Sequence, residues 1–270
     1  TVCSLESMAE PYILRYGMNG TQSQQLFDSL SPKGWVPQHI DIVNIDGKMH
    51  YAGVWLKEDN KTAWEARHNL TEKQYQEMMD YLSPKGYIPY SITVYQNEQS
   101  QTRFAAIWRK EPDIKFVARH NLTEPQYTKL LKEMEQEGLY IYTVAAYEEG
   151  GTAKFAAAWQ PSYFVKKDQY IERHHINTAT SQQLFDELSP KGYIPLEFIG
   201  YTVKGAVNFA LLWTNEIKIP WQVRHNLSPE QFQSYENMFK SQQYYLYRLK
   251  GYNNKGKINY IAGWISYKEQ

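Results

Sequence analysis

The chain has 270 residues, of which 42% are hydrophobic, and its 29 basic residues are balanced by 29 acidic ones. This apolar content is enough for a sizeable core and argues against an intrinsically disordered chain. The neutral balance gives no general attraction for nucleic acid, and no apolar run approaches the roughly 20 residues that span a bilayer. Because Cys3 is the only cysteine, an intrachain disulfide is excluded.

Three markers recur along the chain with a common period of about fifty residues, which is the signature of a tandem repeat. The first is an arginine three positions after an aromatic residue, at Arg15, Arg67, Arg119, Arg173 and Arg224. The second is a tryptophan near the end of each unit, at Trp55, Trp108, Trp159, Trp213 and Trp264. The third is Ser-Pro-Lys-Gly, which begins at Ser31, Ser83 and Ser189. We therefore expect a single repeat domain, 1–270, with units at 12–59, 64–111, 116–162, 170–216 and 221–267.

Each unit begins with a predicted strand around the arginine, and a predicted helix follows. Thr71, Thr123 and Ser228 stand directly after three of these strands, where a side-chain oxygen can cap a helix. In the second unit, apolar residues then fall at helical spacing on one face, at Tyr75, Met78, Met79 and Leu82. The third unit repeats this pattern with Tyr127, Leu130, Leu131 and Met134. We expect the helix to end at Pro-Lys-Gly, where glycine can adopt the left-handed conformation.

Two further strands complete each predicted unit. Residues 87–95 alternate in the manner of a strand. Turn signals at Asp46-Gly47, Gly150-Gly151, Gly205 and Gly256 predict hairpins. The closing strand is small and apolar, as at 104–108, and its alanines indicate the close approach of another element, which we expect to be the helix. The predicted fold class is α+β, with five tandem β-α-β-β repeats.

One unit is too small to bury its apolar faces alone, so the units must share a core. Two arrangements satisfy this need: a curved solenoid or half-barrel, and a closed fivefold α/β propeller-like ring. An open array usually has distinctive end units. The first unit has Tyr16-Gly17 where others have His-Asn, and the fifth has residues 240–243 in place of Ser-Pro-Lys-Gly. These departures favour the open array.

The consensus strand aromatic-x-Ala-Arg-His-Asn-Leu-Thr, followed by a helix, Gly-Tyr and a hairpin ending in Phe-Ala-Ala-Ile-Trp, resembles the bacterial tandem repeat domain. It is also similar to the repeats in the N-terminal domain of fungal polyglycine hydrolases. The resemblance extends over residues 12–267 and is most specific at 67–71 and 105–108. In that family a glycine usually follows the histidine. Here Gly17 alone keeps it, although the asparagine of most other units also tolerates positive φ.

The resemblance implies a secreted protein whose repeats are not catalytic, because catalysis in those hydrolases belongs to a separate β-lactamase-like serine domain. The Ser-x-x-Lys motif of that domain has no counterpart in this sequence. The chain begins with Thr-Val rather than Met, which indicates a processed form or a fragment. A longer precursor with an associated catalytic domain is therefore an open expectation.

The recurring Arg-His pair is the only candidate constellation, and it comprises Arg15, Arg67, His68, Arg119, His120, Arg173, His174, Arg224 and His225. Because neighbouring side chains on a strand point to opposite faces, we do not expect the arginine and the histidine to face one groove. A row of arginines would bind carboxylate, sulfate or phosphate groups. A row of histidines would hold a metal ion or titrate near neutral pH. The pattern favours a third interpretation, in which each pair meets a structural need that recurs in every unit.

The sequence therefore favours a secreted, non-catalytic scaffold that binds a glycan, a glycoprotein or a peptide, with no cofactor, metal or nucleic acid. Its 23 tyrosines and 8 tryptophans suit a binding surface. One alternative is an enzyme or small-molecule-binding protein with a central pocket lined by the arginines and histidines, and another is a purely structural protein. Glycosylation sequons begin at Asn19, Asn60, Asn69, Asn121 and Asn226, and three of them coincide with a predicted helix cap.

Overall fold

The computed structural model describes residues 12–58, 62–162 and 169–266. Cys3, the sequon at Asn60 and the expected unit ends at 59 and 267 lie outside these residues. Within them, the chain forms five units of the same design, each made of a three-stranded antiparallel sheet and one helix. The expected β-α-β-β order is confirmed in every unit.

The elements of the five units correspond one to one. The first strands are β1 (Tyr12–Met18), β4 (Trp64–Leu70), β7 (Val117–Thr123), β10 (Tyr170–Ile176) and β13 (Trp221–Leu227). The helices are α1 (Gly20–Leu30), α2 (Glu72–Leu82), α3 (Glu124–Gln136), α4 (Thr178–Leu188) and α5 (Pro229–Ser241). The second strands are β2 (Trp35–Ile45), β5 (Tyr87–Gln96), β8 (Leu139–Glu149), β11 (Ile194–Val203) and β14 (Tyr244–Asn254). The third strands are β3 (Lys48–Lys57), β6 (Thr102–Lys110), β9 (Thr152–Pro161), β12 (Ala206–Thr214) and β15 (Lys257–Ser266).

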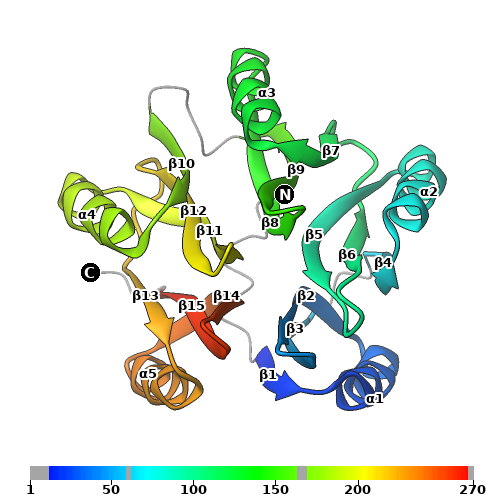
Figure 1. Ribbon diagram of the computed structural model, residues 1–270, viewed down its shortest axis with the longest axis horizontal. Coiled ribbons are helices and arrows are strands. Elements are labelled where there is room, and N and C mark those ends of the chain that lie inside the picture. The colour runs from blue at the N-terminus through cyan, green and yellow to red at the C-terminus, as the bar shows by residue number, and fades with distance from the viewer. Residues whose placement is uncertain (1–11, 59–61, 163–168, 267–270) are drawn as a thin grey trace.

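In every sheet the third strand lies in the middle, with the first and second strands on either side. The second strands of successive units contact one another around the centre of the molecule, and the helices form the periphery (Figure 1). The sheets are five separate sheets of three strands, so the described residues form no closed barrel. The first strand of each unit therefore lies on the outer side of its sheet.

The expected open solenoid or half-barrel is not confirmed, because the first and fifth units contact each other. Strand β14 packs beside β2 in the same way that β2 packs beside β5. The Gly251 N–H donates to the Asp41 carboxylate at 2.6 Å, and the Tyr16 hydroxyl donates to Gln233 Oε1 at 2.6 Å. The five units thus form a ring, which is the arrangement that the sequence left as the alternative.

The Tyr16-Gly17 segment, which replaces the His-Asn of other units, is therefore part of a junction rather than an end cap. Tyr16 occupies the position of the histidine and bonds to α5 of the fifth unit. Gly17 has φ +67°, and its counterparts also have positive φ, so the left-handed backbone conformation is shared by all units. End units that contact each other need no polar cap, which explains why the departures at Tyr16 and Gly17 misled the prediction.

The predicted helix signals are confirmed where the structure describes them. The side chains of Thr71, Thr123 and Ser228 accept a hydrogen bond from the backbone N–H three residues later. The α2 helix ends at Leu82, and a short 3₁₀ turn, η3 (Ser83–Lys85), leads to Gly86 with φ +82°. Equivalent 3₁₀ turns follow α1 and α4 at η2 (Ser31–Lys33) and η5 (Ser189–Lys191).

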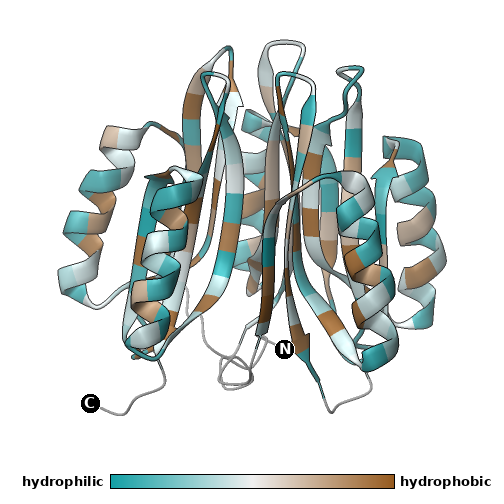
Figure 2. Ribbon diagram, turned by 90° about the horizontal axis from the view of Figure 1, so that it is seen from below, coloured by the Kyte–Doolittle hydropathy of each residue, from teal (hydrophilic) through white to brown (hydrophobic). Residues whose placement is uncertain are grey.

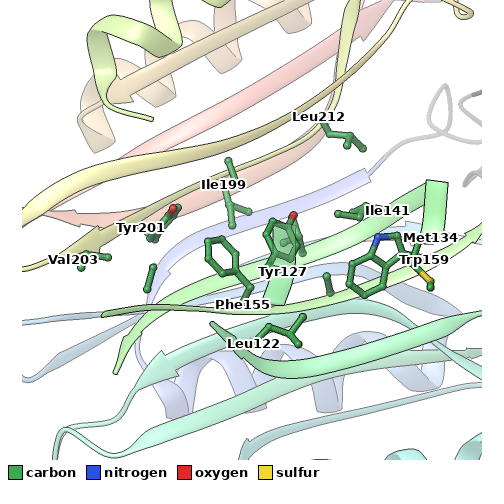
Figure 3. Packing of buried hydrophobic residues seen from close by; sticks show 14 residues of the cluster. Leu122, Tyr127, Met134, Ile141, Phe155, Trp159, Ile199, Tyr201, Val203 and Leu212 are labelled. Atoms are coloured by element: carbon green, nitrogen blue, oxygen red, sulfur yellow. The ribbon is translucent and has the colours of Figure 1, made fainter. Parts of the chain in front are cut away.

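Each apolar cluster in the described residues lies between two consecutive units, including the fifth and the first. Figure 3 shows the cluster between the third and fourth units, where Tyr127, Phe155 and Trp159 face Ile199 and Leu212. Each sheet therefore contributes one face to the preceding junction and the other face to the next. The five closing tryptophans are at most 1% exposed, so they are core residues and not binding platforms.

The alanines of the third strands have two different neighbours. Ala106 lies with Tyr75 and Met79 of α2, as expected, but Ala105 belongs to the cluster shared with the first unit. Alternate alanines thus allow a neighbouring sheet, and not only the helix, to approach closely.

The hairpin turns gather at one end of the ring (Figure 2). There, side chains bridge each unit to the next. The Asn44 amide donates to the Asn97 carbonyl at 2.8 Å, and the Gln96 amide donates to the Glu148 carbonyl at 3.1 Å. The Lys204 N–H donates to the Glu148 carboxylate at 2.8 Å. Thr202 donates to the carbonyl of Asn253, whose amide donates to the Asn44 carbonyl at 3.5 Å. We call this closed series the hairpin-end cycle.

Candidate functional site

The Arg-His strands carry a β-bulge. In the second unit Arg67 pairs with Ala106 but Leu70 pairs with Phe104, so His68 and Asn69 stand outside the regular register. The residue after the histidine has positive φ in every unit, at Gly17, Asn69, Asn121, His175 and Asn226. The asparagines at this position thus adopt the positive φ that their residue type tolerates. Because the bulge interrupts the alternation of side chains, the arginine and the histidine need not face opposite sides.

The candidate arginines lie on the outer strands and fold back on their own backbone. Each donates from Nη1 to the carbonyl of the preceding residue, at 2.7 Å from Arg67 to Ala66 and at 2.8 Å from Arg224 to Val223. The same contact occurs at Arg15, Arg119 and Arg173. Arg224 is half-buried and also lies 5.4 Å from the ring of Tyr235, whereas the other four are exposed.

The candidate histidines join consecutive units. His120 Nε2 lies 2.8 Å from Gln76 Oε1, and His225 Nε2 lies 3.1 Å from Gln182 Oε1. His174 Nε2 lies 3.1 Å from the hydroxyl of Thr128. In each case the partner belongs to the helix of the preceding unit. Among the described contacts, His68 has only an edge contact with the ring of Tyr51, at 6.1 Å.

Local charges separate the proton affinities of these histidines. Burial lowers the pKa of His225, and the Arg224 charge lowers it further. Burial also lowers the pKa of His120, against the opposing effect of Glu72. Burial would lower the pKa of His174 too, but its hydrogen bond and attraction to Glu172 raise it overall. The histidines are therefore not a uniform titrating row.

The structure does not bring the nine candidate residues together. They lie on five different outer strands, while the second strands occupy the centre. A central pocket lined by these arginines and histidines is therefore incompatible with this arrangement. Their contacts agree instead with the structural interpretation, in which the histidine ties one unit to the preceding helix.

Sequence reasoning missed a buried polar cluster on the second strands. Glu197 pairs with Arg248 at 3.1 Å, and Asp41 lies 3.9 Å from Lys250. His39 is 2% exposed, and its Nδ1 lies 3.3 Å from the Ser91 hydroxyl. No spacing rule connects these residues, because they come from different units and only the ring brings them together.

Burial dominates the proton affinities in this cluster. It raises the pKa of Asp41 against the attraction of Lys250, and it lowers the pKa of Lys250 against the attraction of Asp41. Burial, with the charges of Lys250 and Arg248, holds the pKa of His39 well below its usual value. Since the carboxylates are paired with cations inside the ring, we interpret the cluster as an element of ring closure.

Two concave sites lie at the rim, each between the helix of one unit and the first strand of the next. The groove between the first and second units, of about 520 Å³, is lined by Gln24, Phe27, Asp28, Ser31, Pro32, Trp64, Glu65, Ala66 and Arg67. The groove between the fourth and fifth units, of about 780 Å³, is lined by Gln182, Phe185, Asp186, Ser189, Pro190, Trp221, Gln222, Val223, Arg224 and His225. We call them the 1/2 groove and the 4/5 groove. Arg224 and His225 both line the 4/5 groove, so the expectation that the pair faces opposite sides is wrong at this bulge.

Each rim groove combines an aromatic floor with polar walls. The rings of Phe27 and Trp64 lie 6.3 Å apart in the 1/2 groove. Gln24 donates to Asp28 at 2.9 Å on the helix side of this groove. Arg67, on the strand side, pairs with Glu65 at 2.9 Å. These contacts hold the polar groups in place before any ligand arrives.

Among the described residues, no group of three or more histidine, cysteine or acidic side chains could hold a metal ion. Within the same residues, none of the helices has the length and apolar character needed to span a bilayer.

No curated protein matches the chain. A family model described as a polyglycine hydrolase-like structural repeat matches it five times, at residues 9–58, 61–111, 113–162, 167–216 and 218–266. The five matches follow one another along almost the whole sequence, as the five similar units do in the fold. The chain therefore belongs to the polyglycine hydrolase-like structural repeat family and consists of consecutive copies of that repeat.

Proposed function

We propose that the protein is a secreted, non-catalytic binding scaffold whose rim grooves recognise a glycan. The observation that carries this proposal is the chemistry of the 1/2 groove. An indole and a phenyl ring, Trp64 and Phe27, lie beside the planar polar groups of Gln24, Asp28 and Arg67. Sugars present apolar C–H faces and directional hydroxyl groups, and this combination of side chains suits both.

The charge of the groove favours a neutral saccharide over an anionic one. Arg67 is already paired with Glu65, and Asp28 adds a further carboxylate to the lining. An arginine held in this way presents little net positive charge to a phosphate or sulfate group. Carboxylate and carboxamide groups, in contrast, are good acceptors and donors for sugar hydroxyls.

The binding assignment is preferred to the enzyme alternative on geometric grounds. The candidate arginines and histidines lie in separate units, and the buried charges of the second strands are paired inside the ring. An extracellular location accords with the resemblance to secreted repeat proteins and with a polysaccharide ligand. A glycoprotein would be bound through the same groove by its sugar chain.

A glycan array probed with the intact protein tests the proposal. We expect binding to neutral oligosaccharides, and loss of most of that signal when Asp28→Ala and Asp186→Ala are combined. Both aspartates are exposed, so the variant is expected to fold. A matched control is Asp80→Ala, which removes the same side chain from α2, outside the two grooves. Absence of binding by the wild-type protein, or equal loss in the control, would count against the proposal.

A further inference from the structure

The two rim grooves share the same residues at seven equivalent positions. Helix side chains and the turn after each helix supply glutamine, phenylalanine, aspartate, serine and proline, and the next strand supplies tryptophan and arginine. The aromatic floors agree in geometry as well. The Phe27 and Trp64 rings are 6.3 Å apart and inclined by 54°, and the Phe185 and Trp221 rings are 6.3 Å apart and inclined by 47°.

The internal hydrogen bonds of the grooves also correspond. Gln182 donates to Asp186 at 2.9 Å, the distance found between Gln24 and Asp28. Arg224 is held by the Val223 carbonyl at 2.8 Å and by Gln222 at 3.0 Å. The 1/2 groove has the matching pair of restraints, from Ala66 and Glu65. The two sites thus agree at the seven shared positions and in how the arginine is held, but the neutral Gln222 of the 4/5 groove stands where the 1/2 groove has the Glu65 carboxylate.

Packing alone does not require this set of residues, because the other three junctions close without it. Between the second and third units, Met79 and Phe116 stand in place of the phenylalanine and tryptophan. Between the third and fourth units, Thr128 and Lys132 replace the glutamine and aspartate. Between the fifth and first units, Glu236 stands at the position of the phenylalanine and lies buried. The junction of the second and third units keeps Gln76, Asp80 and Arg119, but it does not combine them with the phenylalanine and the tryptophan.

From these observations we infer that the ring carries two equivalent saccharide sites and binds polymers of a repeated neutral sugar bivalently. This inference rests on the proposed function. The 1/2 and 4/5 grooves are separated around the rim by the junction of the fifth and first units, so they are not neighbours (Figure 1). A short oligosaccharide therefore fills one groove, whereas a long chain or a surface dense in chains can fill both.

Bivalency has a measurable consequence. When the second site binds a chain already held by the first, the effective concentration is high, and avidity exceeds the affinity of one site by about 100-fold to 10,000-fold. The protein should therefore hold an insoluble polysaccharide far more strongly than a soluble fragment of it. The two grooves should act as independent sites towards the fragment.

Isothermal titration with cellohexaose, maltohexaose and xylohexaose tests the stoichiometry. We expect one of these neutral hexasaccharides to bind the intact protein at two sites per chain. Asp28→Ala and Asp186→Ala should each reduce the stoichiometry to one, with little change in the remaining affinity. Trp64→Ala and Trp221→Ala should do the same, and the thermal unfolding midpoint of each variant shows whether it remains folded.

Retention on the corresponding insoluble polysaccharide tests the avidity. Each single-groove variant should bind it at least about 100-fold more weakly than the wild-type protein. Phe116→Ala, at the equivalent position of a junction without the groove set, is the matched control and should not change the stoichiometry. One site per wild-type chain would overturn the bivalent inference and leave the proposed function standing. If none of the three sugars binds, both the bivalent inference and the proposed function are overturned.

Discussion

At the scale of single residues, the bulge after the arginine is the most constrained position of the repeat. An L-amino acid in the left-handed region usually costs roughly 1–2 kcal/mol, and glycine and asparagine avoid much of that cost. Asn69 has φ +58°, and its side chain is exposed. Its backbone N–H donates to the Tyr95 hydroxyl at 3.1 Å, which fixes the bulge against the second strand.

We expect Asn69→Ala to lower the free energy of unfolding by about 1 kcal/mol, because alanine lacks the tolerance of asparagine for positive φ. Asn69→Gly should be more stable than Asn69→Ala, because glycine adopts positive φ freely, at an entropic cost of roughly 0.5–1 kcal/mol. Urea denaturation followed by tryptophan fluorescence measures both. Equal stability of the alanine and glycine variants would show that the backbone conformation is not the cause.

His39 provides a prediction about pH. Its pKa is well below the usual value in the folded ring, first because of burial and then because of Lys250 and Arg248. The unfolded chain therefore binds a proton near pH 6.5 that the folded chain does not. Stability should fall as the pH is lowered through this value, by up to about 1.4 kcal/mol per pH unit.

The variant His39→Gln, which keeps a polar side chain of similar size, should reduce this slope between pH 7 and pH 5. Because His225 also has a lowered pKa, part of the slope should remain in this variant. Denaturation curves recorded at several pH values provide the comparison. A slope unchanged by His39→Gln would remove this residue from the explanation.

At the scale of elements, the helices depend on their N-terminal caps. The Thr71 hydroxyl caps α2 by accepting from the Gln74 N–H, and the Gln74 side-chain oxygen accepts from the Thr71 N–H at 2.9 Å. The units that lack threonine or serine use Asn19 and Asn177 for the same purpose. The cap is thus required by the helix, which explains why the sequons at these strands recur without implying a glycan.

Thr71→Ala should reduce stability by about 1 kcal/mol, because the N–H groups of the first turn lose their acceptor. Thr71→Asn should retain most of the stability, since asparagine caps α1 and α4. Thermal and urea unfolding of the two variants measure the difference. If Thr71→Asn is as unstable as Thr71→Ala, the hydrogen bond is not what the threonine provides.

The elements were predictable because their signals are local. The caps, the apolar helix face with Tyr75 and Met79, and the turns at Gly47 and Gly151 lie within a few residues of what they specify. The turn of the second unit carried no such signal, since the segment Asn97–Gln101 closes its hairpin through the Asn97 side chain without a glycine. The bulge was also missed, because strand alternation gives no warning of one extra residue.

The rim grooves could not be recognised at this scale. Asp28, Trp64 and Arg67 belong to two units, and each looks ordinary in its own segment. The clue in the sequence is a similarity between units. Gln-Gln-Leu-Phe-Asp occurs in the first and fourth units, and a tryptophan stands three positions before the arginine in the second and fifth. Its meaning depends on knowing that consecutive units contact each other at these positions.

At the scale of the whole molecule, the junction between the fifth and first units buries a carboxylate on its helix. Glu236 lies buried on α5, where the helices of the other units carry apolar residues. It accepts a hydrogen bond from the Tyr12 hydroxyl of the first unit and another from Trp264 at 2.7 Å. On β14 of the same junction, Gly251 lets β2 approach so closely that an added Cβ would lie 3.0 Å from Val43.

Polar groups that match only each other make the fifth unit pair with a first unit rather than with another face. We expect Glu236→Ala to cost about 2–4 kcal/mol, because the Tyr12 hydroxyl and the Trp264 N–H both lose their acceptor. We also expect concentration-dependent oligomers, measured by light scattering after size exclusion.

The matched control is Met79→Ala, at the same position of α2, where Trp108 donates to the sulfur at 3.1 Å. This variant should lose stability through its cavity but remain monomeric, because it lies inside the chain rather than at the closure. A monomeric Glu236→Ala variant of normal stability would refute the role given to this carboxylate.

Closure of the five units into a ring could not be predicted from the sequence. Whether the last unit meets the first depends on the small rotation between neighbours, summed over all junctions, and no residue encodes that sum by its type. Tyr16 looked like the mark of an end because its partner Gln233 is more than two hundred residues away.

The hairpin-end cycle has a consequence for how such a protein can arise. Its bonds link the fifth unit to the first as they link the others, so these bonds do not distinguish the junction at which the first and last units meet. A gene in which the order of the units is circularly permuted, so that another unit comes first, would encode the same ring with its chain ends at another junction. Lineages built from these segments could thus shuffle their order by duplication and loss while the finished shape stayed unchanged.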